Sequence, residues 1–192
     1  MIVGLTGRAG SGKDSVGEYL RKEYGAALLS FAAPLKAMVR EMFDLTDEQV
    51  NTLDGKETPD PRWIGPNGEA RTPRQILQVV GTEGFRAVDP SFWVKRAMRT
   101  AMLCVRDGAP MVVFTDVRFP NELEAIQDAG GAVLRLVKPD GPGTASVAHA
   151  SEAQVDALNV DGELTAPHGH LPMLFAAAGA FVEHFGARRV QR

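Results

Sequence analysis

The stretch Met1-Ile-Val-Gly-Leu-Thr-Gly-Arg-Ala-Gly-Ser-Gly-Lys-Asp-Ser15 decides the fold of this 192-residue chain. Its apolar run Ile2–Leu5 predicts a buried strand, and the helical periodicity that starts at Val16 predicts a helix. The turn between them has the pattern Gly7-x-x-x-x-Gly12-Lys13, which in this context is typical of a phosphate-binding P-loop. Glycines let backbone N–H groups converge on an anion, and the N-terminus of the helix adds its dipole.

We expect this turn to hold the phosphates of ATP. Lys13 would supply a positive charge to the β- and γ-phosphates, which makes it the first predicted catalytic residue. The residues predicted to contact ATP are Arg8, Ala9, Gly10, Ser11, Gly12, Lys13, Asp14 and Ser15. An accidental glycine-rich match is the alternative, and the strand before the turn and the helix after it argue against that alternative.

One residue departs from the usual P-loop pattern. The lysine is normally followed by Ser or Thr, whose hydroxyl binds Mg²⁺, whereas here it is followed by Asp14 and then Ser15. A triphosphate repels a carboxylate unless a cation lies between them. We therefore expect Asp14 to face Mg²⁺ or its waters, with Ser15 as a second candidate for the hydroxyl role. The alternative is that Asp14 only caps the helix.

Composition narrows the class of protein. The net charge of −3 and a pI near 5.8 argue against a protein that binds a nucleic-acid polymer through a basic face. Cys104 is the only cysteine, which excludes an intramolecular disulfide and a thiolate zinc cluster, and we expect it to be a buried core thiol. No apolar run is long enough to span a membrane and the N-terminus does not resemble a signal peptide, so we expect a cytoplasmic protein without a membrane partner.

Apolar, β-rich segments alternate with helical ones along the chain. The expected strands are Ile2–Leu5, Ala27–Phe31, Met111–Thr115 and Ala132–Val137, with a weaker one near Ala157–Val160. The expected helices cover Lys13–Tyr24, Pro34–Phe43, short stretches after Thr46 and Thr72, a long stretch from Pro90 through Val105, Pro120 to Gly130, and Leu171–Phe185. This alternation predicts an α/β fold of the P-loop NTPase type, with three α/β/α layers and a mostly parallel sheet covered on both faces.

Two segments show no periodicity. Asp54–Arg71 is rich in proline, glycine and charge, and Pro139–Ala148 is similar but nearly uncharged. Long irregular loops in a compact domain often act as lids or substrate loops, and surface decoration is the alternative.

A second candidate site residue follows the predicted strand Met111–Thr115. Asp116 comes directly after this strand, where a P-loop protein needs a carboxylate to hold Mg²⁺ through water. Arg118 follows at the same edge of the sheet and could either bind a phosphate or pair with Glu122. We interpret Asn121 as a residue that begins a helix rather than as a ligand.

Phosphoryl transfer requires concentrated positive charge. Besides Lys13, the predicted catalytic residues are Arg74, Arg86 and Arg118. Arg71 and Arg74 flank the start of a predicted helix, where guanidinium groups cost electrostatic energy unless an anion is bound.

The other candidates each have a functional and a structural interpretation. Lys36 and Phe31 belong to the segment after the second predicted strand, at the edge where ligands bind. The rings of Phe31 and Trp93 could stack on a base, and core packing is the alternative. Gln78 lies one turn after Arg74 and could bind the edge of a base, while a solvated glutamine is the alternative.

Five motifs together resemble the deoxynucleoside monophosphate (dNMP) kinases of tailed phages and related bacterial elements. In order they are Gly12-Lys13-Asp14-Ser15, Ser30-Phe-Ala-Ala-Pro-Leu-Lys36, Thr72-Pro-Arg74-Gln-Ile-Leu-Gln78-Val-Val-Gly-Thr-Glu83, Asp116-Val-Arg118-Phe-Pro-Asn121-Glu122 and His149-Ala-Ser-Glu152. The resemblance extends from the P-loop to about Glu152, and the unusual Gly-Lys-Asp-Ser variant is part of it.

The resemblance implies a nucleoside-monophosphate-kinase-like fold. Residues 1–192 would form a single P-loop kinase domain with a mostly helical acceptor-binding insertion at about 34–107. Lys13, Asp14 and Ser15 would belong to the ATP·Mg²⁺ site, and Arg74 and Lys36 would lie near the acceptor. The segment 139–148 lacks the arginines that a kinase lid often carries, and Lys138 and Arg135 are candidates to replace them. The predicted acceptor-binding residues are therefore Phe31, Lys36, Arg71, Arg74, Gln78, Trp93 and Lys138.

The function that these features predict is transfer of the ATP γ-phosphate to a dNMP, giving a dNDP and ADP. The acceptor phosphate is already largely ionised at neutral pH, so no general base is required. The expected partners are ATP and dNMPs, the expected cofactor is Mg²⁺, and the protein would be a monomer or a homodimer. One alternative is a P-loop kinase for another small phosphorylated metabolite, such as phosphomevalonate or dephospho-coenzyme A. Another is a non-catalytic nucleotide-binding switch.

Overall fold

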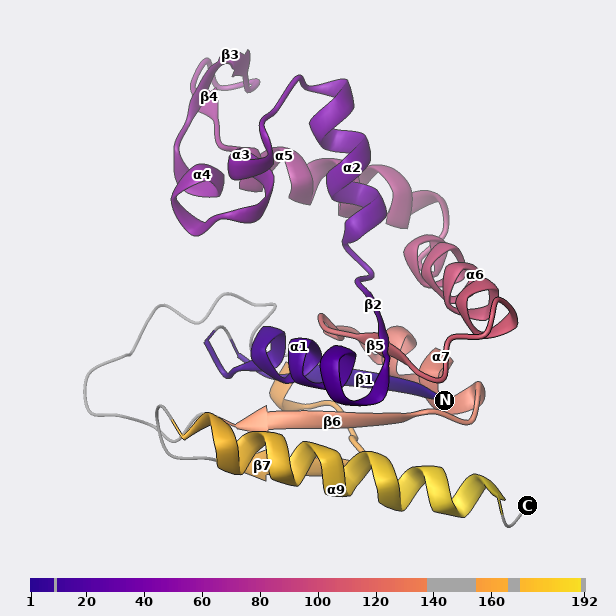
Figure 1. Ribbon diagram of the computed structural model, residues 1–192. Helices are drawn as coiled ribbons and strands as arrows, with labels where there is room; N and C mark the ends of the chain where they lie inside the picture. Colours follow the sequence, from indigo (N-terminus) through magenta and orange to yellow (C-terminus); the bar gives the residue numbers. More distant parts are fainter. Residues whose placement is uncertain (9, 138–154, 166–169, 191–192) are drawn as a thin grey trace. The chain divides into compact units, whose positions relative to one another are not determined.

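The computed structural model describes residues 1–8, 10–137, 155–165 and 170–190 (Figure 1). The chain divides into two compact units. The first, which we call the sheet unit, consists of residues 1–31 and 97–192, and the second, the inserted unit, consists of residues 32–96.

The sheet unit contains five strands in the order β2-β5-β1-β6-β7, and every pairing between neighbours is parallel. The strands are β1 (Ile2–Thr6), β2 (Ala27–Leu29), β5 (Val112–Phe114), β6 (Ala132–Val137) and β7 (Gly162–Thr165). The central strand β1 is buried along its whole length, as expected of a strand covered on both faces. The predicted α/β class and parallel sheet are confirmed.

Helices cover the two faces of this sheet. On one face, α1 (Lys13–Tyr24) and α9 (Leu171–Val190) lie side by side and bury Leu20 and Ala178 against Leu5 and Leu134 (Figure 1). On the other face, α7 (Pro120–Asp128) packs on β1 and β6 through the fully buried Ile126. A Cβ on Gly4 of β1 would come within 2.8 Å of the Ile126 side chain, so the glycine permits this close approach.

The inserted unit is mostly helical and has a small core of its own around Val39, Leu45, Val50 and Ile76. Its elements are α2 (Ala33–Met42), α3 (Asp47–Asn51), α4 (Leu53–Glu57), β3 (Asp60–Ile64), β4 (Ala70–Arg71), α5 (Pro73–Gln78), a π-helical stretch (Val79–Arg86) and the start of α6 (Phe92–Arg106). The helix α6 continues into the sheet unit. The helix starts expected at Thr46 and Thr72 are present, and the structure shows a capping box at each, with Gln49 and Gln75 as the reciprocal partners.

Some sequence-based expectations were wrong. The segment 54–71 is not irregular throughout, because it contains most of α4 and the antiparallel pair β3–β4. Residues 157–160 form no strand: Leu158 is buried in the irregular segment that follows a turn at Ala157, and β7 begins only at Gly162. The apolar residues that suggested a strand are therefore explained by the burial of Leu158 in an irregular segment. The final helix runs to Val190, beyond the predicted Phe185.

Cys104 is half-buried rather than buried, because it lies on α6 between the exposed side chains of Leu103 and Val105. The irregular segment 139–148 and the helix start expected at Ser151 lie outside the described residues. Within the described part of the chain, no helix combines the length and apolar character that crossing a membrane requires.

Candidate nucleotide-binding site

The predicted P-loop connects β1 to α1, and two glycines determine its course. Gly7 has a φ of 140°, and a Cβ there would lie 2.3 Å from the Leu136 carbonyl oxygen on β6. Gly12 is the N-cap of α1 with a φ of 92°. Only glycine adopts such angles without strain, so the backbone needs both glycines to turn from the strand into the helix. Ala9 lies outside the described residues.

Lys13 is the first residue of α1, and its side chain folds back over the loop. The ammonium Nζ donates to the carbonyl oxygens of Gly7 at 2.7 Å and Arg8 at 2.8 Å, and to Ser11 Oγ at 3.3 Å. The positive charge is therefore held against the loop backbone, next to the N-terminus of a helix, where an anion is favoured.

Asp14 is the second residue of α1, and its side chain is exposed. The N-cap position belongs to Gly12, and no side chain caps this helix by a hydrogen bond. The alternative that Asp14 serves as a side-chain cap is therefore wrong. Ser15, the next residue, is half-buried. The Asp14 carboxylate and the Ser15 hydroxyl both provide oxygen atoms of the kind that coordinate Mg²⁺, in the first turn of α1.

Asp116 follows β5 and links the ends of two strands. Its carboxylate accepts hydrogen bonds from Ser30 Oγ at 2.6 Å and from the Phe31 N–H at 2.8 Å, both in the segment after β2. These bonds fix the orientation of the carboxylate. Because β1 and β5 are neighbouring parallel strands, Asp116 and the P-loop leave the sheet at the same edge.

Glu122 on α7 binds the backbone of the segment that carries Arg118. The buried Glu122 carboxylate accepts the backbone N–H groups of Arg118 at 2.8 Å and Phe119 at 3.2 Å, and so caps the start of α7. The Arg118 side chain is exposed, and none of the ion pairs seen among the described residues joins it to Glu122. Asn121 lies in the first turn of α7, as expected of a residue that begins a helix.

Arg8 and Arg135 are both bound to the segment just before β7. Arg8 pairs with Asp156 at 2.5 Å, on the surface. Arg135 is mostly buried, donates to Glu163 and binds the carbonyl oxygens of Val155 and Leu158. This guanidinium therefore holds β6, β7 and the preceding turn together. The expectation that it replaces a lid arginine is not met, and Lys138 lies outside the described residues.

The predicted acceptor residues of the inserted unit lie on several elements. Arg71 is on β4, Arg74 pairs with Glu57 of α4 at 2.5 Å, and Lys36 Nζ contacts Asn51 Oδ1 at 3.3 Å. Gln78 is exposed at the end of α5, and Arg86 Nη1 donates to the Pro90 carbonyl oxygen at 3.2 Å. Arg86 ends the π-helical stretch, a conformation that is frequent at functional sites.

Two aromatic candidates lie in packed cores instead. Phe31 is 2% exposed and stacks on Phe114 with a ring-centroid distance of 4.4 Å. Trp93 is 5% exposed, and its Nε1 donates to the Gly81 carbonyl oxygen at 3.1 Å. Neither ring has the exposed face that stacking on a base requires, so the core alternative describes both residues.

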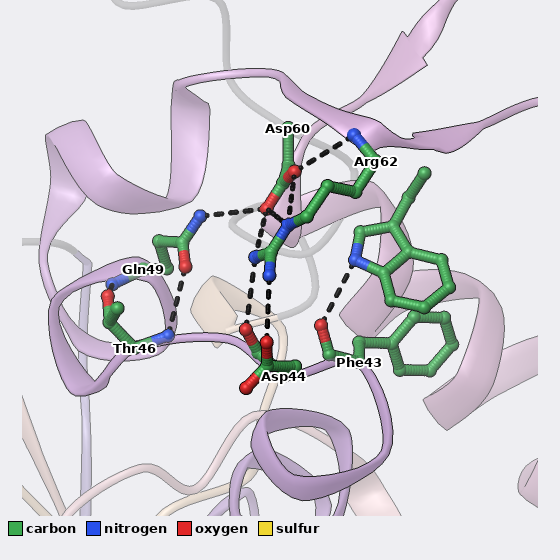
Figure 2. Close-up of polar contacts among 7 residues, drawn as sticks. Phe43, Asp44, Thr46, Gln49, Asp60 and Arg62 are labelled. Atoms are coloured by element: carbon green, nitrogen blue, oxygen red, sulfur yellow. Dashed lines mark hydrogen bonds and ion pairs between the residues drawn. The ribbon is translucent and has the colours of Figure 1, made fainter.

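Sequence reasoning missed a polar cluster in the inserted unit, which we call the Asp60 network. It consists of Asp44, Thr46, Gln49, Asp60 and Arg62 (Figure 2). The Arg62 guanidinium holds the pKa of the Asp60 carboxyl far below its usual range, although burial alone would raise that pKa. The spacing of Asp60 and Arg62, two apart on a strand and so on one face, is the signal that could have revealed the pair.

The lowered pKa of Asp60 makes the stability of the protein depend on pH. A carboxyl with a lowered pKa contributes stability that is present above its unfolded pKa, near 3.9, and is lost as the pH falls toward the folded pKa. We expect Asp60→Asn to reduce the loss of unfolding free energy between about pH 4 and pH 2. Urea denaturation at several pH values across this range measures the unfolding free energy of both proteins. Asp47→Asn, which removes an exposed carboxylate of the same unit, is the control. If the unfolding free energy of wild type and of Asp60→Asn changed equally with pH, the stabilising role of the ionised Asp60 carboxylate would be contradicted.

The fold and the loop define the class of protein. A parallel sheet, with a glycine-rich loop leading from its central strand into a helix that begins with lysine, is the architecture of the P-loop kinases. The solved structure of dephospho-CoA kinase from Campylobacter jejuni is similar, with a TM-score of 0.52 over 98% of both chains. The two sequences are 10% identical, so this likeness concerns the fold alone.

Sequence comparison then identifies the family. The family model for deoxynucleotide monophosphate kinase matches residues 61–165. A protein of Acanthamoeba polyphaga mimivirus that carries the family's name is 38% identical over 169 residues, which cover 82% of this chain and 83% of that protein. The deoxynucleoside-5'-monophosphate kinase of Escherichia phage T5 is 25% identical, and the match covers 85% of this chain and 88% of that protein. The chain belongs to the deoxynucleotide monophosphate kinase family, as its motifs predicted.

Proposed function

We propose that this protein transfers the γ-phosphate of ATP to a deoxynucleoside monophosphate, giving a deoxynucleoside diphosphate and ADP. The observation that carries the proposal is the glycine-shaped loop ending in Lys13, in a chain that belongs to the deoxynucleotide monophosphate kinase family. The identity of the donor and of the products is part of the proposal.

The P-loop would bind the triphosphate of ATP. Backbone N–H groups of residues 8–13 and the N-terminus of α1 would hold the phosphate oxygens. The Lys13 ammonium, which bonds to the Gly7 and Arg8 carbonyl oxygens, would exchange these partners for the β- and γ-phosphates. Arg8 would have to leave its exposed ion pair with Asp156 to join them, which costs little because surface pairs are weak.

The oxygen donors at this edge of the sheet fit Mg²⁺. Asp14 is exposed beside the loop, and the Asp116 carboxylate is oriented by Ser30 and Phe31. Carboxylates and hydroxyls are the donors that this hard cation prefers, and it normally keeps several waters and phosphate ligands. Within the described residues, no three acidic, histidine or cysteine side chains gather as a metal site of their own. In the proposal the cation would arrive with the nucleotide, would be held by Asp14, Ser15 and Asp116, and would neutralise charge on the phosphates.

The acceptor side of the proposal rests on the family motifs. Arg74 would bind the phosphate of the dNMP, because its partner Glu57 is a half-exposed carboxylate that a phosphate can replace. Arg86 and Arg118 would share the charge of the migrating phosphoryl group with Lys13. The residues proposed to bind the rest of the acceptor are Lys36, Arg71, Gln78 and Lys138.

No side chain has to remove a proton in this reaction. The acceptor is a phosphate oxygen that already carries negative charge near pH 7, since the second pKa of a phosphate monoester is about 6. The bond from the β,γ-bridging oxygen to the γ-phosphorus breaks, and a bond from the acceptor oxygen to that phosphorus forms. The protein's contribution is therefore to align the two nucleotides and to neutralise charge.

A coupled assay of ADP release tests the proposal. The acceptors are the four common dNMPs, the corresponding ribonucleotides and phosphomevalonate, and one reaction contains ATP alone. We expect ADP release to depend on a dNMP and to be absent with phosphomevalonate. Equal ADP formation with and without any acceptor would contradict the proposal and favour a nucleotide-binding switch. Turnover only with phosphomevalonate would indicate a kinase for another metabolite.

A further inference from the structure

We propose that Asp60 and Arg62 are positioning residues for acceptor binding. They would fix the β3–β4 hairpin, so that Arg71 and Arg74 present their guanidinium groups to the dNMP in a constant geometry. This inference rests on the proposed function, because it concerns how that acceptor site is built.

Asp60 is the buried centre of the network. Its side chain is 4% exposed, and it accepts hydrogen bonds from Arg62 and Gln49 (Figure 2). Arg62 supplies its backbone N–H at 3.1 Å, Nε at 3.0 Å and Nη2 at 2.7 Å, and Gln49 supplies Nε2 at 3.1 Å. Gln49 also forms the capping box of α3 with Thr46, so the carboxylate joins the hairpin to the start of α3.

Arg62 extends the link to a third segment. Its Nη1 donates to Asp44 Oδ2 and its Nη2 to the Asp44 carbonyl oxygen, each at 3.0 Å. Asp44 lies in the turn between α2 and α3 and has a φ of 47°, a left-handed conformation that Asp tolerates better than most residues. Since Nε, Nη1 and Nη2 of Arg62 all have partners, this guanidinium is engaged in holding the unit together.

The β3–β4 hairpin connects the position of Asp60 to the positions of Arg71 and Arg74. Asp60 lies directly opposite Arg71 in the β3–β4 pairing. Thr72 comes next and caps α5, and Arg74 is the second residue of that helix. A change in the position of Asp60 would therefore displace Arg71 directly and Arg74 through a short, capped connection. A displacement of about 1 Å at a binding residue is enough to lower activity substantially.

Trp63, the neighbour of Arg62, provides a fluorescent reporter of the contact between the β3–β4 hairpin and the turn between α2 and α3. Its indole Nε1 donates to the Phe43 carbonyl oxygen at 3.0 Å, and the two rings meet edge to face at 4.9 Å. The chain has two tryptophans, so a Trp93→Phe background leaves Trp63 alone. The emission of Trp63 then reports whether the hairpin keeps its contact with the turn between α2 and α3.

Steady-state kinetics of Asp60→Asn and Arg62→Lys test the inference, at a temperature where each variant is folded. We expect KM for the dNMP to rise about tenfold, with kcat and KM for ATP within about twofold of wild type. Arg62→Lys keeps the charge but loses the planar fork, and it replaces Asp60→Asn if the latter has a low folded fraction. The matched control is Arg40→Gln, which removes another arginine–aspartate pair of the same unit and should leave all three parameters unchanged.

The possible outcomes are distinguishable. A wild-type KM for the dNMP in both variants, with only lower stability or altered Trp63 emission, would overturn the positioning role. Equal rises in both KM values would overturn it as well, because they would indicate a general defect. Failure of the proposed function would show in the wild-type protein itself, as the absence of turnover with any dNMP.

Discussion

We expect the replacement of Lys13 with alanine to lower kcat for phosphoryl transfer by at least about 100-fold, which is the effect of removing one preorganised donor to a developing charge. The ammonium donates to the loop, at the Gly7 and Arg8 carbonyl oxygens and at Ser11 Oγ. The fold of the sheet unit depends instead on its buried core, so circular dichroism and urea denaturation should be nearly unchanged. Single-turnover and steady-state kinetics with saturating ATP measure the effect.

Lys22→Ala is the matched control for this experiment. Lys22 is an exposed lysine in the last turn of the same helix, away from the loop. Its removal changes the net charge by the same amount and should leave kcat within about twofold, as expected for surface substitutions. Near-normal turnover of Lys13→Ala, or an equal loss in Lys22→Ala, would contradict the assignment of the donor site.

The second large effect concerns Asp14. Asp14→Asn keeps the size of the side chain and removes its charge, so we expect the Mg²⁺ concentration for half-maximal activity to rise by about tenfold or more. Stability should fall by less than about 1 kcal/mol, the usual contribution of an exposed carboxylate in the first turn of a helix. A Mg²⁺ titration of the ADP-release rate at fixed ATP measures the shift.

Glu23→Gln provides the control, because Glu23 is an exposed carboxylate in the last turn of the same helix. Its Mg²⁺ titration should overlay that of the wild type. If the Mg²⁺ titration of Asp14→Asn matched that of the wild type, we would conclude that Asp14 has a purely electrostatic role at the helix terminus. In that case Ser15 would become the first candidate for the hydroxyl ligand.

Local sequence patterns were sufficient to predict the phosphate loop and four of the five strands of the parallel sheet, all but β7. The apolar run at Ile2–Leu5, the glycine spacing up to Gly12 and the helical period from Val16 each follow from short-range geometry. The capping boxes at Thr46 and Thr72 were predictable for the same reason, since donor and acceptor are three residues apart.

Contacts between distant residues were not predictable in this way. The Asp60 network joins residues from a turn, a short helix and a hairpin, and no period connects them. The ring of Phe31 had two interpretations until Phe114 was seen to stack on it. The same holds for Arg135, which is a plausible phosphate ligand by charge but is bound to Glu163 and to the turn before β7. Residue type alone does not separate a structural guanidinium from one that binds substrate.

The most direct test of the central claim is to follow the γ-phosphate itself. ATP radiolabelled at the γ-position is incubated with the protein, Mg²⁺ and a dNMP, and the products are separated by thin-layer chromatography. We predict that the label appears in the deoxynucleoside diphosphate, in an amount equal to the ADP formed. Label found only in inorganic phosphate, or retained in ATP with every dNMP, would contradict the claim that this loop delivers the phosphoryl group to a nucleotide acceptor.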